Sequence, residues 1–167
     1  MRDSDFQSTV VRGSAVAAAS LGTVVVSSTA SDSHTWNLVY LELLIRELGY
    51  DVVNLGPCVP DELLAEHCRE IQPVLVVISS VNGHGHQDGL RVIKQLRGCA
   101  RLRATPVVIG GKLGIAAGLD DAQVRELMAA GFDMVFQEGA DAGEFRRFVG
   151  AIPRPAAWLP DGVGAWV

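Results

Sequence analysis

The sequence has few cysteines, no long apolar run and no excess of basic residues. Its cysteines, Cys58, Cys68 and Cys99, are odd in number and form no C-x-x-C pair, which argues against disulfides and structural zinc. No apolar run approaches the roughly 20 residues that span a bilayer. A net charge of -5 and a pI near 5.3 argue against nucleic acid or an anionic membrane as a partner.

The N-terminal segment also lacks the features of a signal peptide. The Ala-rich run 15–21 is short, and Asp3 and Asp5 precede it where a signal peptide carries basic residues. We therefore expect a cytoplasmic protein that does not associate with membranes. A length of 167 residues, 49% of them hydrophobic, suits one domain. We expect a disordered extension over 1–20, an ordered domain over 21–150 and a tail over 151–167.

What the sequence does contain is an alternation of apolar strands and amphipathic helices. The predicted strands cover 22–28, 51–55, 74–78, 107–109 and 132–136, and the predicted helices cover 38–48, 60–71, 88–97, 120–130 and 141–149. Continuous apolar strands between helices indicate a parallel sheet covered on both faces. The expected fold class is α/β, a doubly wound five-stranded parallel sheet of the Rossmann or flavodoxin-like kind with strand order 2-1-3-4-5.

Polar and small residues follow three strands of this predicted sheet. They are Asp32 and His34 after the first strand, Ser79, Ser80 and Val81 after the third, and Gly110 and Gly111 after the fourth. In the order 2-1-3-4-5 these strands are neighbours at the switch point, so their carboxyl ends form one crevice. A histidine that follows a carboxylate by two residues suits a metal ligand with its orienting partner. Small residues at the strand ends leave a slot for a ligand.

Each of these features also has a simpler interpretation. Asp32 could be the N-cap of the first helix, and Ser79 could only satisfy backbone groups at a strand end. Gly110 and Gly111 could form an ordinary turn. His84 and His86 flank a glycine in a polar loop, where such a pair is usually solvated and is not a metal site.

Together the motifs resemble a known family. Asp32-x-His34, Ser79-x-Val81 and Gly110-Gly111 resemble the D-x-H-x-x-G, S-x-L and G-G signature of cobalamin-binding domains, over about 22–149. The runs 51–56 and 79–85 are most similar to the small subunit of glutamate mutase (methylaspartate mutase). The resemblance implies that His34 replaces the cofactor's dimethylbenzimidazole as axial cobalt ligand and that Asp32 orients its ring. It also implies a slot for the nucleotide tail. We expect the Gly-rich loop that carries His84 and His86 to lie against the corrin edge or a partner subunit.

The residues expected to contact the cofactor belong to the strand ends and the loops that follow them. They are Ser31, Asp32, Ser33, His34, Thr35, Asn37, Ser79, Ser80, Val81, Gly83, Gly110, Gly111, Lys112, Leu113 and Gly114, with His34 as the metal ligand and no catalytic residue assigned. Val81 replaces the motif leucine, and Asn37 replaces its glycine. Asn37 shares a helical face with Leu41 and Leu44, so we expect it to point inward and hydrogen-bond the tail or a loop beside it. The alternative is that Asn37 is only an N-cap.

The resemblance implies the cobalamin-carrying small subunit of an adenosylcobalamin-dependent mutase, an isomerase that interconverts glutamate and 3-methylaspartate. A large barrel-type partner subunit would hold the small amino-acid substrate, and the chain alone would be inactive. Two other classes stay open. A corrinoid methyl carrier usually has a helical bundle before the first strand of this fold. In this sequence only about twenty residues precede the first predicted strand, which argues against that class. A flavodoxin-like module could bind an FMN phosphate through 27–29 and Thr35, but FMN does not account for His34. A phosphoacceptor receiver would need an aspartate where Ser79 stands.

Overall fold

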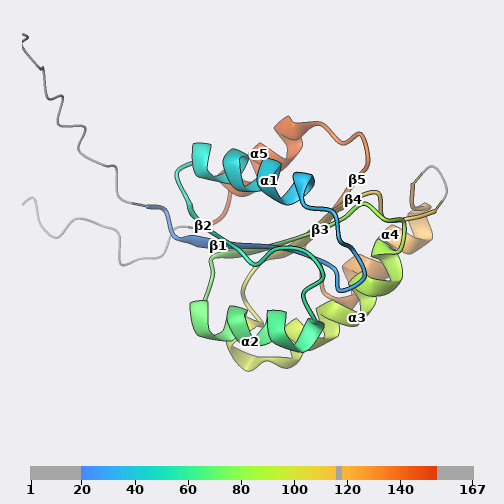
Figure 1. The fold of residues 1–167 in the computed structure, drawn as a ribbon, viewed down its shortest axis with the longest axis horizontal. Coiled ribbons are helices and arrows are strands. Elements are labelled where there is room, and N and C mark those ends of the chain that lie inside the picture. Colours follow the sequence, from blue (N-terminus) through green and yellow to red (C-terminus); the bar gives the residue numbers. More distant parts are fainter. Residues whose placement is uncertain (1–19, 116–117, 154–167) are drawn as a thin grey trace, which may run out of the picture.

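The computed structural model describes residues 20–115 and 118–153, which form one parallel sheet between two layers of helices (Figure 1). The strands are β1 (Thr23–Ser28), β2 (Asp51–Asn54), β3 (Leu75–Ser80), β4 (Val107–Gly111) and β5 (Met134–Gln137). Their order is β2-β1-β3-β4-β5. Ser28 pairs with Ser79, and Ser79 pairs with Gly110, so the three predicted motifs meet at one edge. The predicted fold class and strand order are confirmed.

Helices cover both faces of the sheet. They are α1 (Trp36–Glu47), α2 (Asp61–Ile71), α3 (Gly85–Gly98), α4 (Asp121–Ala130) and α5 (Ala142–Gly150), with a short 3-10 helix at Ala100–Leu102. Val24 and Val26 point to one core together with Leu38 of α1 and Val149 of α5. Val25 points to the other core, which is formed with α2, α3 and α4. The alternation of strand side chains between two apolar cores explains why the strands are apolar throughout.

Several element boundaries differ from the predictions by a few residues, and two of these differences affect the site. The helix α3 begins at Gly85, three residues early, because Gly85 lies against Leu113, where a Cβ would be 2.6 Å from Leu113 Cδ2. His86 is therefore helical: its side chain is 16% exposed and its Nε2 lies 3.0 Å from Glu126 Oε2. The solvated-loop interpretation is wrong for His86, whereas His84 is exposed. The strand β4 includes Gly110 and Gly111, so the turn interpretation of these glycines is also wrong.

The predicted terminal segments lie almost entirely within 1–19 and 154–167, outside the described residues. At the start of the predicted tail, Ile152 is buried in the core that Val24 and Val149 share. Among the helices of the described ranges, none is long and apolar enough to cross a membrane.

Candidate functional site

The loop after β1 is built around the buried carboxylate of Asp32. Its Oδ1 accepts the backbone N–H of His34 at 3.0 Å and lies 2.7 Å from His34 Nδ1. Its Oδ2 accepts the backbone N–H of Val81 at 2.5 Å, which joins this loop to the end of β3. Burial by itself raises the pKa of Asp32, but these hydrogen bonds outweigh burial and hold the pKa below its ordinary value. The N-cap interpretation of Asp32 is wrong, because Thr35 occupies the N-cap position of α1.

One ring nitrogen of His34 contacts Asp32, and the other makes no hydrogen bond within the described residues. An ionised Asp32 can only accept, so Nδ1 carries the proton that it shares with Oδ1. In the neutral imidazole the other nitrogen, Nε2, then has its lone pair available. No hydrogen bond within the described residues engages Nε2, and the side chain is 48% exposed. An oriented imidazole of this kind is the usual form of a metal-ligating histidine.

A second set of hydrogen bonds attaches this loop to α3. Ser31 Oγ donates to Asp88, and Asn82 Nδ2 donates to Ser31 Oγ at 2.9 Å. Arg91 pairs with Asp88 at 2.8 Å and also with Asp61 of α2. Burial raises the pKa of Asp88, but the hydrogen bonds from Ser31 and Arg91, with the Arg91 charge, outweigh burial and lower it. The loop that carries His34 is therefore also attached to α3 through Asp88 and Arg91, which the sequence motifs did not indicate.

These two aspartates predict a loss of stability in acid. A carboxyl group whose native pKa is lowered stabilises the fold fully above its unfolded-state pKa, near ~4, and this contribution is lost as the pH falls below that value. Asp88→Asn should lower the free energy of unfolding at neutral pH by about 1–3 kcal/mol and reduce its decline below pH ~4. Urea titrations across pH would measure both effects. Asp51→Asn, at an exposed position of β2, is the matched control, and an equal effect there would contradict this account.

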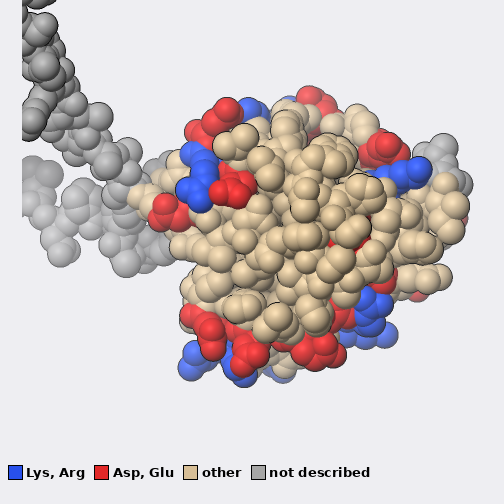
Figure 2. Space-filling model, viewed as in Figure 1, with Lys and Arg blue, Asp and Glu red and all other residues tan. Residues whose placement is uncertain are grey.

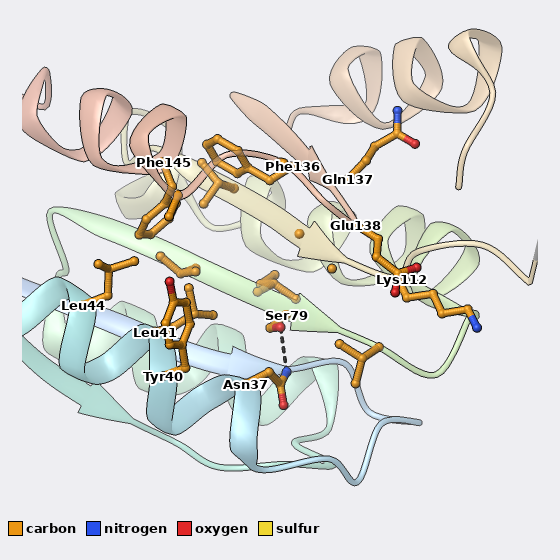
Figure 3. Close-up of a pocket in the computed structure, with 18 of the residues that line it drawn as sticks. Asn37, Tyr40, Leu41, Leu44, Ser79, Lys112, Phe136, Gln137, Glu138 and Phe145 are labelled. Carbon is orange, nitrogen blue, oxygen red and sulfur yellow. Dashed lines mark hydrogen bonds between the residues drawn. The ribbon is translucent and has the colours of Figure 1, made fainter. Parts of the chain in front are cut away.

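A cavity of about 450 Å³ opens beside His34 (Figure 3). It lies between α1 and α5, over the ends of β3, β4 and β5. The predicted residues that line it are His34, Asn37, Ser79, Val81, Gly110, Gly111 and Lys112. Gly111 has φ +111°, and a Cβ there would lie 2.3 Å from the Ser80 carbonyl oxygen, so the close approach of β4 to β3 requires glycine. The cavity lies at the sheet edge where the three motifs predict a slot.

Asn37 lies on the inner side of α1 at this slot. It is the second residue of the helix and is buried, so the N-cap alternative is wrong. Its Nδ2 donates to Ser79 Oγ at 2.6 Å (Figure 3). Within the described residues its Oδ1 is buried and has no hydrogen-bond partner. The amide thus occupies space at the wall of the slot where the family motif has no side chain.

Several predicted contact residues do not line this cavity. Ser31 bonds Asp88 and Asp32 bonds His34. Thr35 is the N-cap residue of α1, and Ser80 Oγ donates to Asn82. Ser33 is exposed beside them. Another group lines a separate cavity of about 230 Å³ near the start of α3, and its predicted members are Gly83, Leu113 and Gly114.

The residues that form the far wall of the slot were not predicted from the sequence. This wall is formed by Phe136 of β5 and Phe145 of α5, whose ring centroids lie 5.4 Å apart in an edge-to-face arrangement, and by residues 137–141. Leu41 and Leu44 complete the near wall, on the helical face that Asn37 shares. The apolar pattern of α5 indicated burial but not which face of the sheet it covers.

Of the hydroxyls considered for an FMN phosphate, those of residues 27–29 are buried, whereas Thr35 is exposed. Ser27 and Ser28 are fully buried and donate to backbone oxygens, those of Ser28 at 3.2 Å and of Asp32 at 2.8 Å. Thr29 Oγ1 lies 3.5 Å from Ser80 Oγ and is buried as well. The hydroxyls of residues 27–29 therefore make their contacts inside the protein and do not face the slot beside His34.

Comparison with known proteins agrees with this geometry. Residues 22–145 match the B12 binding domain family. The glutamate mutase sigma subunit of Halobacterium salinarum is 33% identical over 122 residues, which cover 72% of this chain and 80% of that protein. Trimethylamine corrinoid protein 1 of Methanosarcina mazei is 25% identical over 92 residues, 55% of this chain and 43% of that protein.

The fold is also found in solved structures. A cobalamin-binding protein from Desulfitobacterium hafniense superposes with a TM-score of 0.62 at 18% identity, over 77% of this chain and 57% of that one. Signal receiver domains have the same fold, as in a protein from Colwellia psychrerythraea with a TM-score of 0.56 at 11% identity, over 77% of this chain and 94% of that one. The sequence match is what separates these classes. The chain belongs to the B12 binding domain family and is a homologue of glutamate mutase sigma subunits.

Proposed function

We propose that this chain is the cobalamin-carrying small subunit of an adenosylcobalamin-dependent mutase that interconverts glutamate and 3-methylaspartate with a large barrel-type subunit. The observation that carries the proposal is the His34 ring, with Nδ1 bonded to buried Asp32 and Nε2 open beside a 450 Å³ slot. The similarity to glutamate mutase sigma subunits supports the choice of reaction.

The residues present fit a metal that arrives inside a cofactor. Among the described residues no three histidine, cysteine, aspartate or glutamate side chains gather to hold a bare ion. A single histidine suits a metal whose other positions are already occupied by a macrocycle. The slot is walled by Leu41, Leu44 and Phe136, which suits a flat, largely apolar heterocycle at the end of a nucleotide tail.

The chain's own residues would bind and orient, and the cofactor would carry the chemistry. His34 would ligate cobalt through Nε2, and Asp32 would keep the Nδ1 proton and fix the ring. Ser79, Gly110 and Gly111 would line the slot for the tail. Adenosylcobalamin supplies a carbon radical when its cobalt–carbon bond breaks. The substrate amino acid would be held mainly by the large subunit.

The proposal predicts that turnover needs both subunits. His34 and the slot lie open at the sheet edge, so a radical formed on the isolated chain would not be shielded from water. We expect no 3-methylaspartate from glutamate and adenosylcobalamin with this chain alone, and turnover after a large glutamate mutase subunit is added. The His34→Ala chain with the same subunit is the control. Turnover by the isolated chain would contradict the proposal.

A methyl-transfer assay beside the mutase assay tests the methyl-carrier alternative, which the similarity to trimethylamine corrinoid protein 1 favours. A chain that accepts a methyl group on its corrinoid from a methyltransferase, and gives no mutase activity with any large subunit, would be a carrier.

Asp32→Asn should weaken corrinoid binding by about 10–100-fold, as is usual for the partner of a ligating histidine. The amide keeps an acceptor but loses the charge that holds the Nδ1 proton. Titration followed by the visible spectrum of the corrinoid would measure the affinity. Asp51→Asn is the matched control, and unchanged binding in Asp32→Asn would remove Asp32 from the site.

A further inference from the structure

The outer side of α1 carries an apolar stripe that nothing in the described residues covers. Its members lie at helical spacings of three and four, and each is more than half exposed: Trp36 66%, Val39 52%, Tyr40 53% and Leu43 60%. The opposite side of the same helix is the one that packs on the sheet, through Leu38 and Ile45. Apolar side chains gathered in this way mark an interaction surface.

The stripe is also free of charge. The charged residues of α1, Glu42, Arg46 and Glu47, all lie in its last six positions. Figure 2 shows the surface over the first half of α1 without any Lys, Arg, Asp or Glu. A segment that covers the stripe would therefore be apolar as well, because a charge buried there would find no partner.

One segment of this chain starts beside α1 and has that character. The helix α5 is tied to the end of α1 by Arg146 and Glu47 at 2.9 Å, and Tyr50 Oη donates to the Val149 carbonyl at 3.2 Å. Ile152 then lies in the same core as Ile45. The chain that continues from residue 153 thus leaves the domain near the C-terminal end of the stripe.

The composition and reach of residues 154–167 match the stripe. This segment has two tryptophans, Trp158 and Trp166, and only two charged residues, Arg154 and Asp161. Fourteen residues can span up to about 46 Å when extended, whereas the 12 residues of α1 are about 18 Å long. Because the segment is attached to the same chain, its effective concentration at the stripe is high.

We propose that residues 154–167 dock on the apolar stripe of α1 and cover Trp36, Tyr40 and Leu43. Trp36 and Tyr40 also line the slot beside His34. This inference is independent of which reaction the cofactor serves, and it is tested without cofactor.

Tryptophan fluorescence of the full chain tests this docking. The protein has three tryptophans, so in Trp36→Phe all of the emission comes from Trp158 and Trp166. We expect this emission to be protected from acrylamide, and the further change Leu43→Lys to remove the protection and shift the emission to the red. Leu63→Lys is the matched control, because Leu63 is an exposed leucine on α2, on the other face of the sheet. Val39→Lys is a second variant of the stripe, and circular dichroism would confirm that each variant folds.

Four results would overturn the proposal. Full quenching in Trp36→Phe would show that the segment is not docked, and protection that survives both Leu43→Lys and Val39→Lys would place it elsewhere. Protection that depends on protein concentration, with a dimer in sedimentation, would mean that a second copy covers the stripe. Loss of binding to the large subunit in Leu43→Lys, with no change in the tryptophan signals, would assign the stripe to that subunit and also overturn the docking.

Discussion

His34→Ala should remove the protein's ligand to cobalt and weaken corrinoid binding more than the about 10–100-fold expected for Asp32→Asn. The reason is geometric: Nε2 of His34 is the nitrogen that Asp32 leaves open, and it lies at the mouth of the slot. With alanine the slot walls remain, so weak binding through the nucleotide tail should persist. Corrinoid titration by visible spectroscopy measures this change.

The matched control for His34→Ala is His67→Ala, which removes a partly exposed histidine from α2, away from the slot. That variant should bind corrinoid like the unmodified protein. If His34→Ala binds as tightly as His67→Ala, His34 is not the ligand, and the proposed function loses the observation on which it depends.

Gly111→Ala should be strongly destabilising. Its backbone has φ +111°, and the new Cβ would meet the Ser80 carbonyl oxygen at 2.3 Å, a backbone atom that cannot turn aside. Strain in φ and overpacking together cost on the order of 2–6 kcal/mol. Chemical denaturation would measure the loss, and corrinoid binding should fall with it because the strand end moves.

Gly98→Ala is the matched control for Gly111→Ala. Gly98 ends α3, and no atom lies within 4 Å of the position that a Cβ would take there. Alanine at this position should therefore be neutral or stabilising by up to about 1 kcal/mol. Equal stability of the Gly111→Ala and Gly98→Ala proteins would show that β4 can separate from β3, and that the glycine is not needed for the fold.

The elements that could be predicted are those whose signal is local. Strands such as β3 are apolar over 75–78 because each face meets a core, and Gly49 ends α1 where the periodicity stops. The order of the strands then brings Asp32, Ser79 and Gly110 to one edge. Spacing along the chain and the switch-point rule were sufficient for this part of the site.

The parts that escaped prediction depend on packing between distant segments. The position of Phe145 opposite Leu44 follows from which face α5 covers, and its own sequence does not determine that face. The early start of α3 depends on the contact between Gly85 and Leu113. The bond from Ser31 to Asp88 joins residues 57 apart, and no motif links them. The hydroxyls of Ser27 and Ser28 suggested a phosphate site, but they donate hydrogen bonds to nearby backbone oxygens.

The most direct test of the central claim is electron paramagnetic resonance of the chain with bound cob(II)alamin, after growth on nitrogen-15 histidine. If His34 Nε2 is the axial ligand, the nitrogen splitting changes with the label, and Asn37→Gly shows the same change. A splitting that does not change with the label would contradict the account, because the cofactor's own base would then still be on cobalt. If the change appeared only in Asn37→Gly, the amide that bonds Ser79 would be what keeps the tail out of the slot.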